Sequence, residues 1–294
     1  MQVRVAAFSK INLLLDVLGK RPDGYHDVNM IMQGVRLSDQ VIVAEAATNT
    51  ITTNSPYVPN NKSNLALKAA LLMQASLDLP PVAIKIDKHI PVSAGMAGGS
   101  SDAAAVLLAM DRLFALGLSR QQLEAFAAEI GSDVPFCLSA GTAVATERGE
   151  LIEDLSLLSP FHLVLVKADF GVPTARVYKA YRKKKKPVAG QERLDYFLKL
   201  IREDDTLGIL NSLYNDLEET TFSMYPKVRS IKEKLKHLGA RHVLMSGSGP
   251  TVFAAFHAEA EAWRFYKKAK ADFPMVYLTS TVSRWDLDRR IGVS

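Results

Sequence analysis

The most chemically suggestive stretch of the chain is a glycine- and serine-rich segment, 91–101, directly before a run that predicts a helix. Glycine lets backbone N–H groups approach a ligand without an obstructing Cβ atom. The start of a helix adds unpaired N–H groups and a partial positive charge, so this combination favours an anion, most commonly phosphate. Ser100 or Ser101 is the expected helix cap, and either hydroxyl could reach a phosphate oxygen or Mg²⁺. A glycine turn that only lets a helix pack closely is the alternative.

Two polar side chains near the N-terminus alternate with apolar neighbours. On a strand, Lys10 and Asn12 point to the same face, while Ile11 and Leu13 enter the core. An ammonium group beside an amide can hold anionic or hydroxyl oxygens, although an ordinary sheet surface is the alternative.

A strong turn signal, Pro22-Asp23-Gly24, follows and displays an aromatic residue and a histidine. Tyr25 and His26 offer a ring on which a base could stack and a group that could read it. A purely structural role for the pair is the alternative.

A candidate general base lies in 131–136. Asp133 sits between small residues and an apolar Val-Pro-Phe run, which predicts partial desolvation. Desolvation raises the pKa of a carboxylate and a nearby lysine lowers it, and a general base depends on that balance. A turn that ends a helix is the alternative, and Glu129 and Glu150 are rival acids. A second glycine-serine turn, 246–250, either packs against the first loop or closes a plain hairpin.

These groups must be positioned by interspersed strands and helices. Apolar alternation predicts strands over 3–8, 11–17, 41–45, 82–87, 142–146, 161–166, 242–245, 251–256 and 275–281. Helical spacing predicts helices over 65–76, 101–116, 120–130, 196–202 and 228–238. The order indicates an α+β fold with antiparallel strands and helices on one face, and a boundary near 151–160.

Composition indicates a globular protein with two domains. The chain has 294 residues, of which 48% are hydrophobic and 23% charged. Its one cysteine, Cys137, excludes an internal disulfide and suits a reducing cytosol, and no apolar stretch reaches the length of a membrane span. We therefore expect a cytoplasmic protein that does not bind membranes.

The net charge of +5 and the pI of about 9.1 suit an anionic ligand as well as nucleic acid. The basic run 182–186 would fit a nucleic acid or a membrane surface. It has no interleaved aromatic residues, so a solvated loop before Pro187 is the simpler interpretation, and we expect no nucleic-acid partner.

Taken together, the motifs resemble the signatures of the GHMP kinases. The glycine loop is similar to that superfamily's Pro-x-x-x-Gly-Leu motif, with Met96 in place of the leucine and a glycine-serine run after it. Within the superfamily, the chain resembles the 4-diphosphocytidyl-2-C-methyl-D-erythritol kinases from residue 5 to about residue 256. The stretches that carry this resemblance are Lys10–Leu13, Arg21–His26, Ala97–Ala104, Gly131–Phe136 and Met245–Phe253.

The resemblance implies a two-domain α+β GHMP kinase fold with antiparallel sheets and packed helices. A ribosomal-protein-S5-like N-terminal domain would cover 1–155, and a ferredoxin-like C-terminal domain would cover 156–294. It also implies a reaction, transfer of the ATP γ-phosphate to the 2-hydroxyl of 4-diphosphocytidyl-2-C-methyl-D-erythritol, in the non-mevalonate isoprenoid pathway.

The resemblance further assigns roles to the polar residues. Asp133 would accept the proton of the substrate hydroxyl, and Lys10 would keep that carboxylate ionised and orient the hydroxyl. Tyr25 and His26 would bind the cytosine, and Tyr178 would close its other face. The implied substrate-binding residues are Asn12, Tyr25, His26, Thr174 and Tyr178.

ATP with Mg²⁺ would bind at the glycine-serine loop. The implied contacts are Pro91, Val92, Ser93, Ala94, Gly95, Met96, Ala97, Gly98, Gly99, Ser100 and Ser101, with Asn64 and Lys88 in the adenine pocket. No carboxylate is placed unambiguously to hold the metal. Asp102 would repel phosphate, so we expect it to point away.

Three alternatives stay open at this point. The chain could be a GHMP kinase for a mevalonate- or homoserine-type substrate, a binding protein of this fold without activity, or an RNA-binding protein. The Tyr25-His26 pair argues against the first, and Lys10 with Asp133 against the second. We expect a cytidine-diphosphate-linked small molecule as the partner, and a monomer or weak homodimer.

Overall fold

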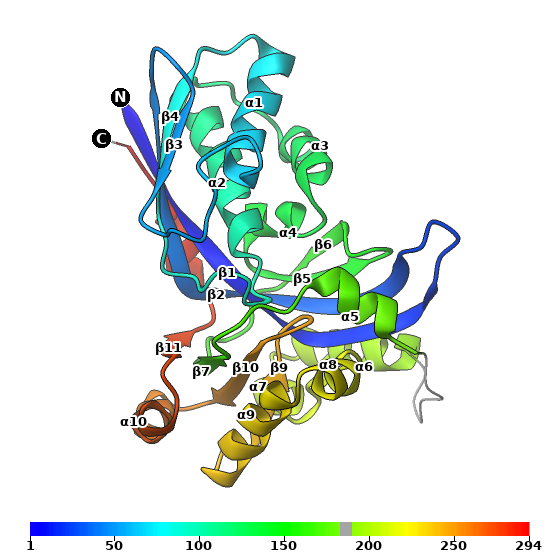
Figure 1. Ribbon diagram of the computed structural model, residues 1–294. Coiled ribbons are helices and arrows are strands. Elements are labelled where there is room, and N and C mark those ends of the chain that lie inside the picture. The colour runs from blue at the N-terminus through cyan, green and yellow to red at the C-terminus, as the bar shows by residue number, and fades with distance from the viewer. Residues whose placement is uncertain (183–189, 294) are drawn as a thin grey trace.

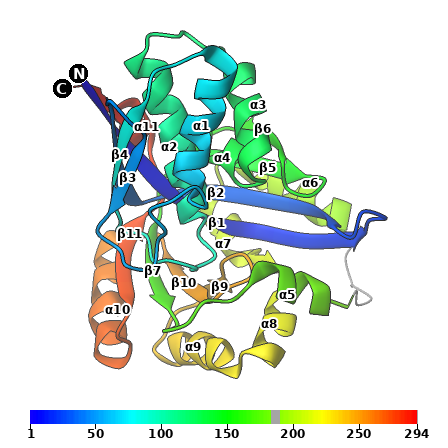
Figure 2. The same cartoon turned by 45° about the horizontal axis from the view of Figure 1, so that its top comes forward.

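The computed structural model describes residues 1–182 and 190–293, arranged as two sheets with helices packed against them (Figures 1 and 2). The strands are β1 (Gln2–Lys20), β2 (His26–Glu45), β3 (Thr50–Thr53), β4 (Val82–Asp87), β5 (Thr142–Thr146), β6 (Leu151–Leu155), β7 (His162–Lys167), β8 (Tyr214–Asn215), β9 (His242–Met245), β10 (Thr251–Phe256), β11 (Val276–Ser280) and β12 (Ile291–Val293). The helices are α1 (Leu65–Leu77), α2 (Gly98–Leu113), α3 (Arg120–Ile130), α4 (Val134–Ser139), α5 (Thr174–Ala180), α6 (Gly190–Arg202), α7 (Thr206–Asn211), α8 (Glu218–Met224), α9 (Pro226–His237), α10 (Glu259–Asp272) and α11 (Arg284–Asp288).

The first sheet is mixed, and a long antiparallel ribbon of β1 and β2 runs through it (Figure 1). One half of β2 pairs with β4 and the other half with β5, so the ribbon spans the sheet. Register shifts between Phe8 and Ser9 and between Asn12 and Leu14 bracket the polar part of β1. Such irregularities bend a strand and redirect side chains, and they are common beside active sites.

The expectation of purely antiparallel strands is wrong for this sheet. β3 pairs with β4 in parallel, because α1 carries the chain from one to the other as a crossover helix. β8 also pairs with β1 in parallel. β3 is short and β8 shorter still, and neither was predicted from the apolar pattern.

The second sheet is antiparallel throughout and has the order β11-β7-β10-β9. In chain order its strands are β7, β9, β10 and β11, so the first and third lie side by side at the centre. Helices connect β7 to β9 and β10 to β11. This is the ferredoxin-like arrangement, and it confirms the α+β expectation for this half of the molecule.

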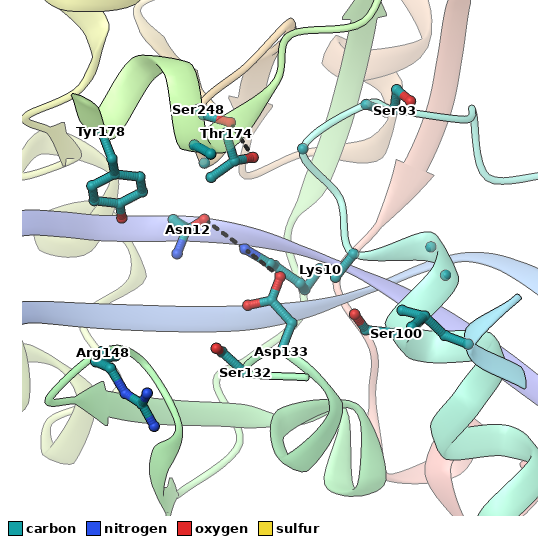
Figure 3. A pocket seen from close by; sticks show the side chains of 18 of the residues that line it. Lys10, Asn12, Ser93, Ser100, Ser132, Asp133, Arg148, Thr174, Tyr178 and Ser248 are labelled. Atoms are coloured by element: carbon teal, nitrogen blue, oxygen red, sulfur yellow. Dashed lines mark hydrogen bonds and ion pairs between the residues drawn. The ribbon is translucent and has the colours of Figure 1, made fainter. Parts of the chain in front are cut away.

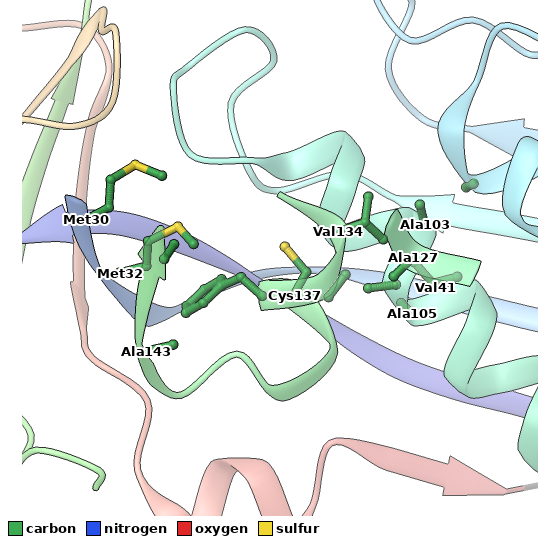
Figure 4. Packing of buried hydrophobic residues seen from close by; sticks show 14 of the residues in the cluster. Met30, Met32, Val41, Ala103, Ala105, Ala127, Val134, Cys137 and Ala143 are labelled. Atoms are coloured by element: carbon green, nitrogen blue, oxygen red, sulfur yellow. The ribbon is translucent and has the colours of Figure 1, made fainter. Parts of the chain in front are cut away.

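Small residues let α2 and α4 pack closely against the first sheet (Figures 2 and 4). Ala103 and Ala105 of α2 are fully buried, as are Val134 and Cys137 of α4. Figure 4 shows the α4 side chains between α2 and Met32 of β2. Because α4 begins directly after Asp133, this packing fixes the position of that carboxylate.

Several predicted elements have the same bounds in the structure, namely β4, α3, β5, β9 and β10. The predicted strands 3–8 and 11–17 are one continuous strand, β1, because the bulge after Phe8 bends the strand without ending it. The loosened pattern at 151–160 contains β6, which pairs with β5. Helix α10 escaped prediction although Ala262, Phe265 and Ala269 form its buried stripe.

The end of the described chain returns to the first sheet. β12 pairs with β1. Arg290 is buried, and its guanidinium donates to the carbonyls of Ala6 (2.9 Å), Cys137 (2.7 Å) and Leu138 (2.6 Å). We propose a division of the chain after β6, with β12 completing the N-terminal lobe. Among the described helices, none combines the length and the apolarity needed to cross a membrane.

Candidate active site

A cavity of about 1110 Å³ runs between β1, the glycine loop with the start of α2, α5 and the turn between β9 and β10 (Figure 3). It is lined by residues from every motif that the sequence singled out. The glycine loop lies at one end and Tyr178, with His26 beside it, at the other, and Lys10 with Asp133 lies between them (Figure 3).

The centre of the cavity is a lysine, an amide and a carboxylate. Lys10 Nζ donates to Asn12 Oδ1 at 3.0 Å and lies 3.8 Å from Asp133 Oδ2 (Figure 3). The Lys10 side chain is 6% exposed, whereas the Asp133 side chain is 36% exposed and open to the cavity. The prediction that Lys10 and Asn12 share a face is confirmed, and Ile11 and Leu13 are fully buried, as expected.

The two rival acids lie elsewhere. Glu150 receives a hydrogen bond from Arg148 at 2.7 Å, and neither it nor Glu129 is among the described residues that line the cavity. Asp133 is therefore the acid that the fold brings to Lys10.

The glycine loop leads into an uncapped helix. Helix α2 begins at Gly98, three residues before the predicted start, with Ala97 in a left-handed conformation and no side chain capping it. The expected cap at Ser100 or Ser101 is therefore wrong, because both residues lie inside the helix. Its first N–H groups, at Gly98, Gly99 and Ser100, lie at the cavity wall, where they can bind an anion.

The second glycine-serine turn packs against this loop and also closes the β9–β10 hairpin. Ser246 Oγ donates to the Gly95 carbonyl at 2.9 Å. Gly95 has φ +72°, and a Cβ there would lie 2.7 Å from the carbonyl oxygens of both Gly249 and Ser246. Backbone from the two lobes thus meets at Gly95 with no room for a side chain.

A buried ion cluster supports the loop from behind. Lys88 Nζ is paired with Asp39 and lies 2.7 Å from Asp102 Oδ2. Burial disfavours the ammonium, but the two carboxylates outweigh it and raise the pKa of Lys88. Burial raises the pKa of Asp102 above its ordinary value, and the charge of Lys88 opposes this shift. Asp102 turns toward Lys88, as expected of a carboxylate that would otherwise repel phosphate.

The opposite end of the cavity is aromatic. The His26 ring lies 5.5 Å from that of Tyr178, and 6.0 Å and edge-on from that of Tyr181. Tyr25 is 57% exposed, and the Arg148 guanidinium lies 5.2 Å from its ring centroid. Burial, with a contribution from the charge of Lys20, lowers the pKa of His26, so its imidazole is neutral at pH 7.

Helix α5 brings Thr174 and Tyr178 to the cavity wall (Figure 3). The Thr174 and Ser248 hydroxyls lie 2.8 Å apart, so the start of α5 is tied to the second turn. Burial raises the pKa of Tyr178, whose phenol therefore stays protonated. Both residues line the cavity, and their contacts with substrate stay a prediction.

Four of the residues predicted to contact ATP have their side chains engaged in contacts within the protein. The Met96 side chain is buried in the core, and Ser101 Oγ donates to the Phe8 carbonyl at 2.7 Å, so neither lines the cavity. Asn64 lines it, but its amide caps α1 at Ala66 N–H and donates to the Pro59 carbonyl. Lys88 lines it as the centre of the ion cluster.

Sequence reasoning missed two cavity residues of interest, Arg148 and Tyr181. Arg148 lies between β5 and β6, and the folding of that hairpin toward Tyr25 brings it to the site. Tyr181 follows α5, a helix too short to be predicted. Of the basic run, only Arg182 is described and lines the cavity, and 183–186 lie outside the described residues.

Similarity to known proteins agrees with this geometry. The GHMP kinases N terminal domain matches residues 64–141, and the GHMP kinases C terminal domain matches 197–274. A 4-diphosphocytidyl-2-C-methyl-D-erythritol kinase from Bacillus mycoides is 44% identical over 280 residues, covering 94% of this chain and 96% of that protein. One from Exiguobacterium sibiricum is 44% identical over 283 residues, covering 95% and 97%.

Solved structures extend the comparison. A 4-(cytidine 5'-diphospho)-2C-methyl-D-erythritol kinase is 30% identical with a TM-score of 0.78, covering 95% of this chain and 99% of that one. Homoserine kinase from Cytophaga hutchinsonii shares the fold at 16% identity, with a TM-score of 0.75 and coverages of 96% and 94%. The chain belongs to the GHMP kinases and, within them, to the 4-diphosphocytidyl-2-C-methyl-D-erythritol kinases.

Proposed function

We propose that this protein transfers the γ-phosphate of ATP to the 2-hydroxyl of 4-diphosphocytidyl-2-C-methyl-D-erythritol, a step of non-mevalonate isoprenoid synthesis. One observation carries the proposal: a single cavity has an anion-binding helix start at one end and an aromatic His-Tyr wall at the other, with Lys10 and Asp133 between them. This order suits a nucleotide-tagged alcohol whose hydroxyl must meet the phosphate of ATP.

The chain's own residues would act mainly by positioning, because phosphoryl transfer needs little covalent help. Asp133 accepts the hydroxyl proton as the bond to phosphorus forms, and the Lys10 ammonium, 3.8 Å away, pairs with that carboxylate and orients the hydroxyl. Asn12, hydrogen-bonded to Lys10, fixes the direction of the ammonium. The N–H groups at the start of α2 stabilise charge on the transferred group.

Magnesium would enter with ATP and neutralise charge on its phosphates. Among the described residues, no three His, Cys, Asp or Glu side chains form a metal cluster. The oxygen donors beside the loop are the Ser100 hydroxyl and Asp102 Oδ1, and the latter is buried without a hydrogen-bond partner among the described residues. Oxygen donors suit Mg²⁺, so these two would hold it.

An ATP-consumption assay tests the proposal. We expect turnover that requires both 4-diphosphocytidyl-2-C-methyl-D-erythritol and Mg²⁺, and none with mevalonate or homoserine at the same concentration. Turnover with mevalonate or homoserine in place of the cytidine compound would contradict it. We also propose that the enzyme works in the cytosol as a monomer or weak homodimer, which cell fractionation and analytical ultracentrifugation would test.

A further inference from the structure

The two walls of the aromatic end come from parts of the chain that are far apart in the sequence. His26 begins β2 on the β1–β2 ribbon, whereas Tyr178 lies on α5. Stacking on an aromatic ring depends steeply on the separation of the faces. The His26 and Tyr178 rings contact each other, with their centroids 5.5 Å apart. Whatever holds α5 at a fixed distance from the ribbon therefore sets the relative position of the two rings that a base would meet.

Asp216 is attached to the ribbon at two points. It follows β8, which pairs in parallel with β1 at Leu14 and Leu15. Its own N–H donates to the Leu15 carbonyl at 2.9 Å, and its Oδ2 accepts from the Val17 N–H at 3.0 Å. The carboxylate is thus held against β1 by backbone contacts.

Tyr181 connects the same carboxylate to α5. It is the C-cap of that helix, and its hydroxyl donates to Asp216 Oδ2 at 2.7 Å. Its buried ring lies edge-on to His26 and lines the cavity. Burial and the contact with Asp216 raise the pKa of Tyr181, so the hydroxyl remains a donor at neutral pH.

Helix α5 is consequently held at both ends. Thr174 at its start is bonded to Ser248 of the second turn, and Tyr181 at its end is bonded to Asp216 on the ribbon. Tyr178 lies between these attachments and faces His26. Loss of the Tyr181–Asp216 hydrogen bond would free the end of α5 that carries Tyr178. It would leave unaltered the end of the cavity that holds the glycine loop, called here the phosphate end.

We infer that Asp216 and Tyr181 are positioning residues that hold Tyr178 in place relative to His26 and so make the site selective for an acceptor carrying a nucleobase. This inference rests on the proposed function. The phosphate end of the cavity does not depend on the Tyr181–Asp216 hydrogen bond. Loss of that hydrogen bond should therefore weaken acceptor binding and leave ATP binding unchanged.

Tyr181→Phe tests the inference, because it removes the hydroxyl and keeps the ring beside His26. We expect KM for 4-diphosphocytidyl-2-C-methyl-D-erythritol to rise about tenfold, the loss expected for a hydrogen bond to a charged group, with kcat and KM for ATP within about twofold. Calorimetric titration with CDP should show the same loss of affinity.

Tyr214→Phe is the matched control. The Tyr214 hydroxyl donates to the other oxygen of the same carboxylate, Asp216 Oδ1, at 2.9 Å, but Tyr214 lies on β8 and not on α5. We expect this variant to lose stability without a change in KM. Equal KM values for the Tyr181→Phe and Tyr214→Phe variants would overturn the inference.

Asp216→Ala adds a second criterion, because it removes the acceptor of the Tyr181 hydroxyl. It should raise KM like Tyr181→Phe, and the double variant should be no worse than Asp216→Ala alone, because both variants break the same hydrogen bond. Additive losses would overturn the coupling, and if Asp216→Ala does not fold, Tyr181→Phe decides. Absence of wild-type turnover would refute the proposed function instead, and CDP binding by the two tyrosine variants would still test the role of Tyr181.

Discussion

The two ends of the cavity differ in the groups that line them: backbone at one end and side chains at the other. The phosphate end consists of backbone: the loop at Gly95 touches the Ser246–Gly249 turn with no space for a Cβ, and α2 presents uncapped N–H groups. The aromatic end consists of side chains on a ribbon tip and a short helix, and Tyr25 there is 57% exposed.

This difference separates two tasks. Backbone groups bind phosphate whatever the neighbouring side chains are, and changes to them disturb the fold. Side chains on an exposed tip can be exchanged without disturbing the core, so the choice of acceptor can change while phosphoryl transfer persists.

Removing the central carboxylate should have the largest effect. Asp133→Asn should lower kcat by about 10²–10⁴-fold, the usual contribution of a general base. KM for both substrates should change little, since each is held at its own end. Steady-state kinetics check this, with Glu129→Gln as the control outside the cavity. An active Asp133→Asn variant would remove Asp133 from the mechanism.

Crowding the backbone end should come next. Gly95→Ala places a Cβ 2.7 Å from two carbonyl oxygens at φ +72°, so it should cost about 2–4 kcal/mol of folding free energy and raise KM for ATP. Denaturant unfolding and ATP kinetics measure both effects. Gly117→Ala is the control, because its φ of +63° is also left-handed but no atom lies within 4 Å. Equal losses would mean that strain, and not the packing of the two turns, matters.

Truncating the exposed aromatic should affect acceptor binding alone. Tyr25→Ala should raise KM for the cytidine substrate about tenfold, a typical value for one stacked base. Stability and KM for ATP should stay nearly unchanged because the ring is largely exposed. The Tyr25→Phe variant should retain the wild-type KM, and an equal rise in KM for ATP would break the distinction between the two ends.

The smallest expected effect is a shift in pH dependence. The pKa of His26 lies below 6.5, so its imidazole is neutral above that pH and takes up a proton only in more acidic solution. KM for the acceptor should be flat above pH 6.5 and rise below it. Lys20→Gln removes a neighbouring positive charge and should move the His26 titration, followed by NMR, to higher pH. An unmoved or lowered titration would contradict this.

The sequence predicted the elements with strong periodicity, such as α3 and β10, and the face shared by Lys10 and Asn12, because alternation alone decides those features. It placed the start of α2 too late, since a serine is an ordinary cap and the structure leaves this helix uncapped. Ser101, which was expected to cap the helix or contact ATP, lies inside the helix and donates to the Phe8 carbonyl. β8 and α5 are short and depend on tertiary contacts. β8 pairs with β1, and α5 is held by the Ser248 contact at its start and by the Tyr181–Asp216 hydrogen bond at its end. Arg148 and Tyr181 reach the site through such pairings, which no local pattern encodes.

The return of the chain to its first sheet has a consequence for synthesis. Arg290 and Ala6 are 284 residues apart, yet the guanidinium of one secures the carbonyl of the other and the carbonyls at the end of α4. A ribosome releases the N-terminal lobe long before these contacts can form. While the C-terminal lobe is translated, the strand that carries Lys10 and the helix that follows Asp133 therefore lack their hydrogen bonds to Arg290. Such long-range closure favours slow folding, and it gives chaperones an interval in which to act.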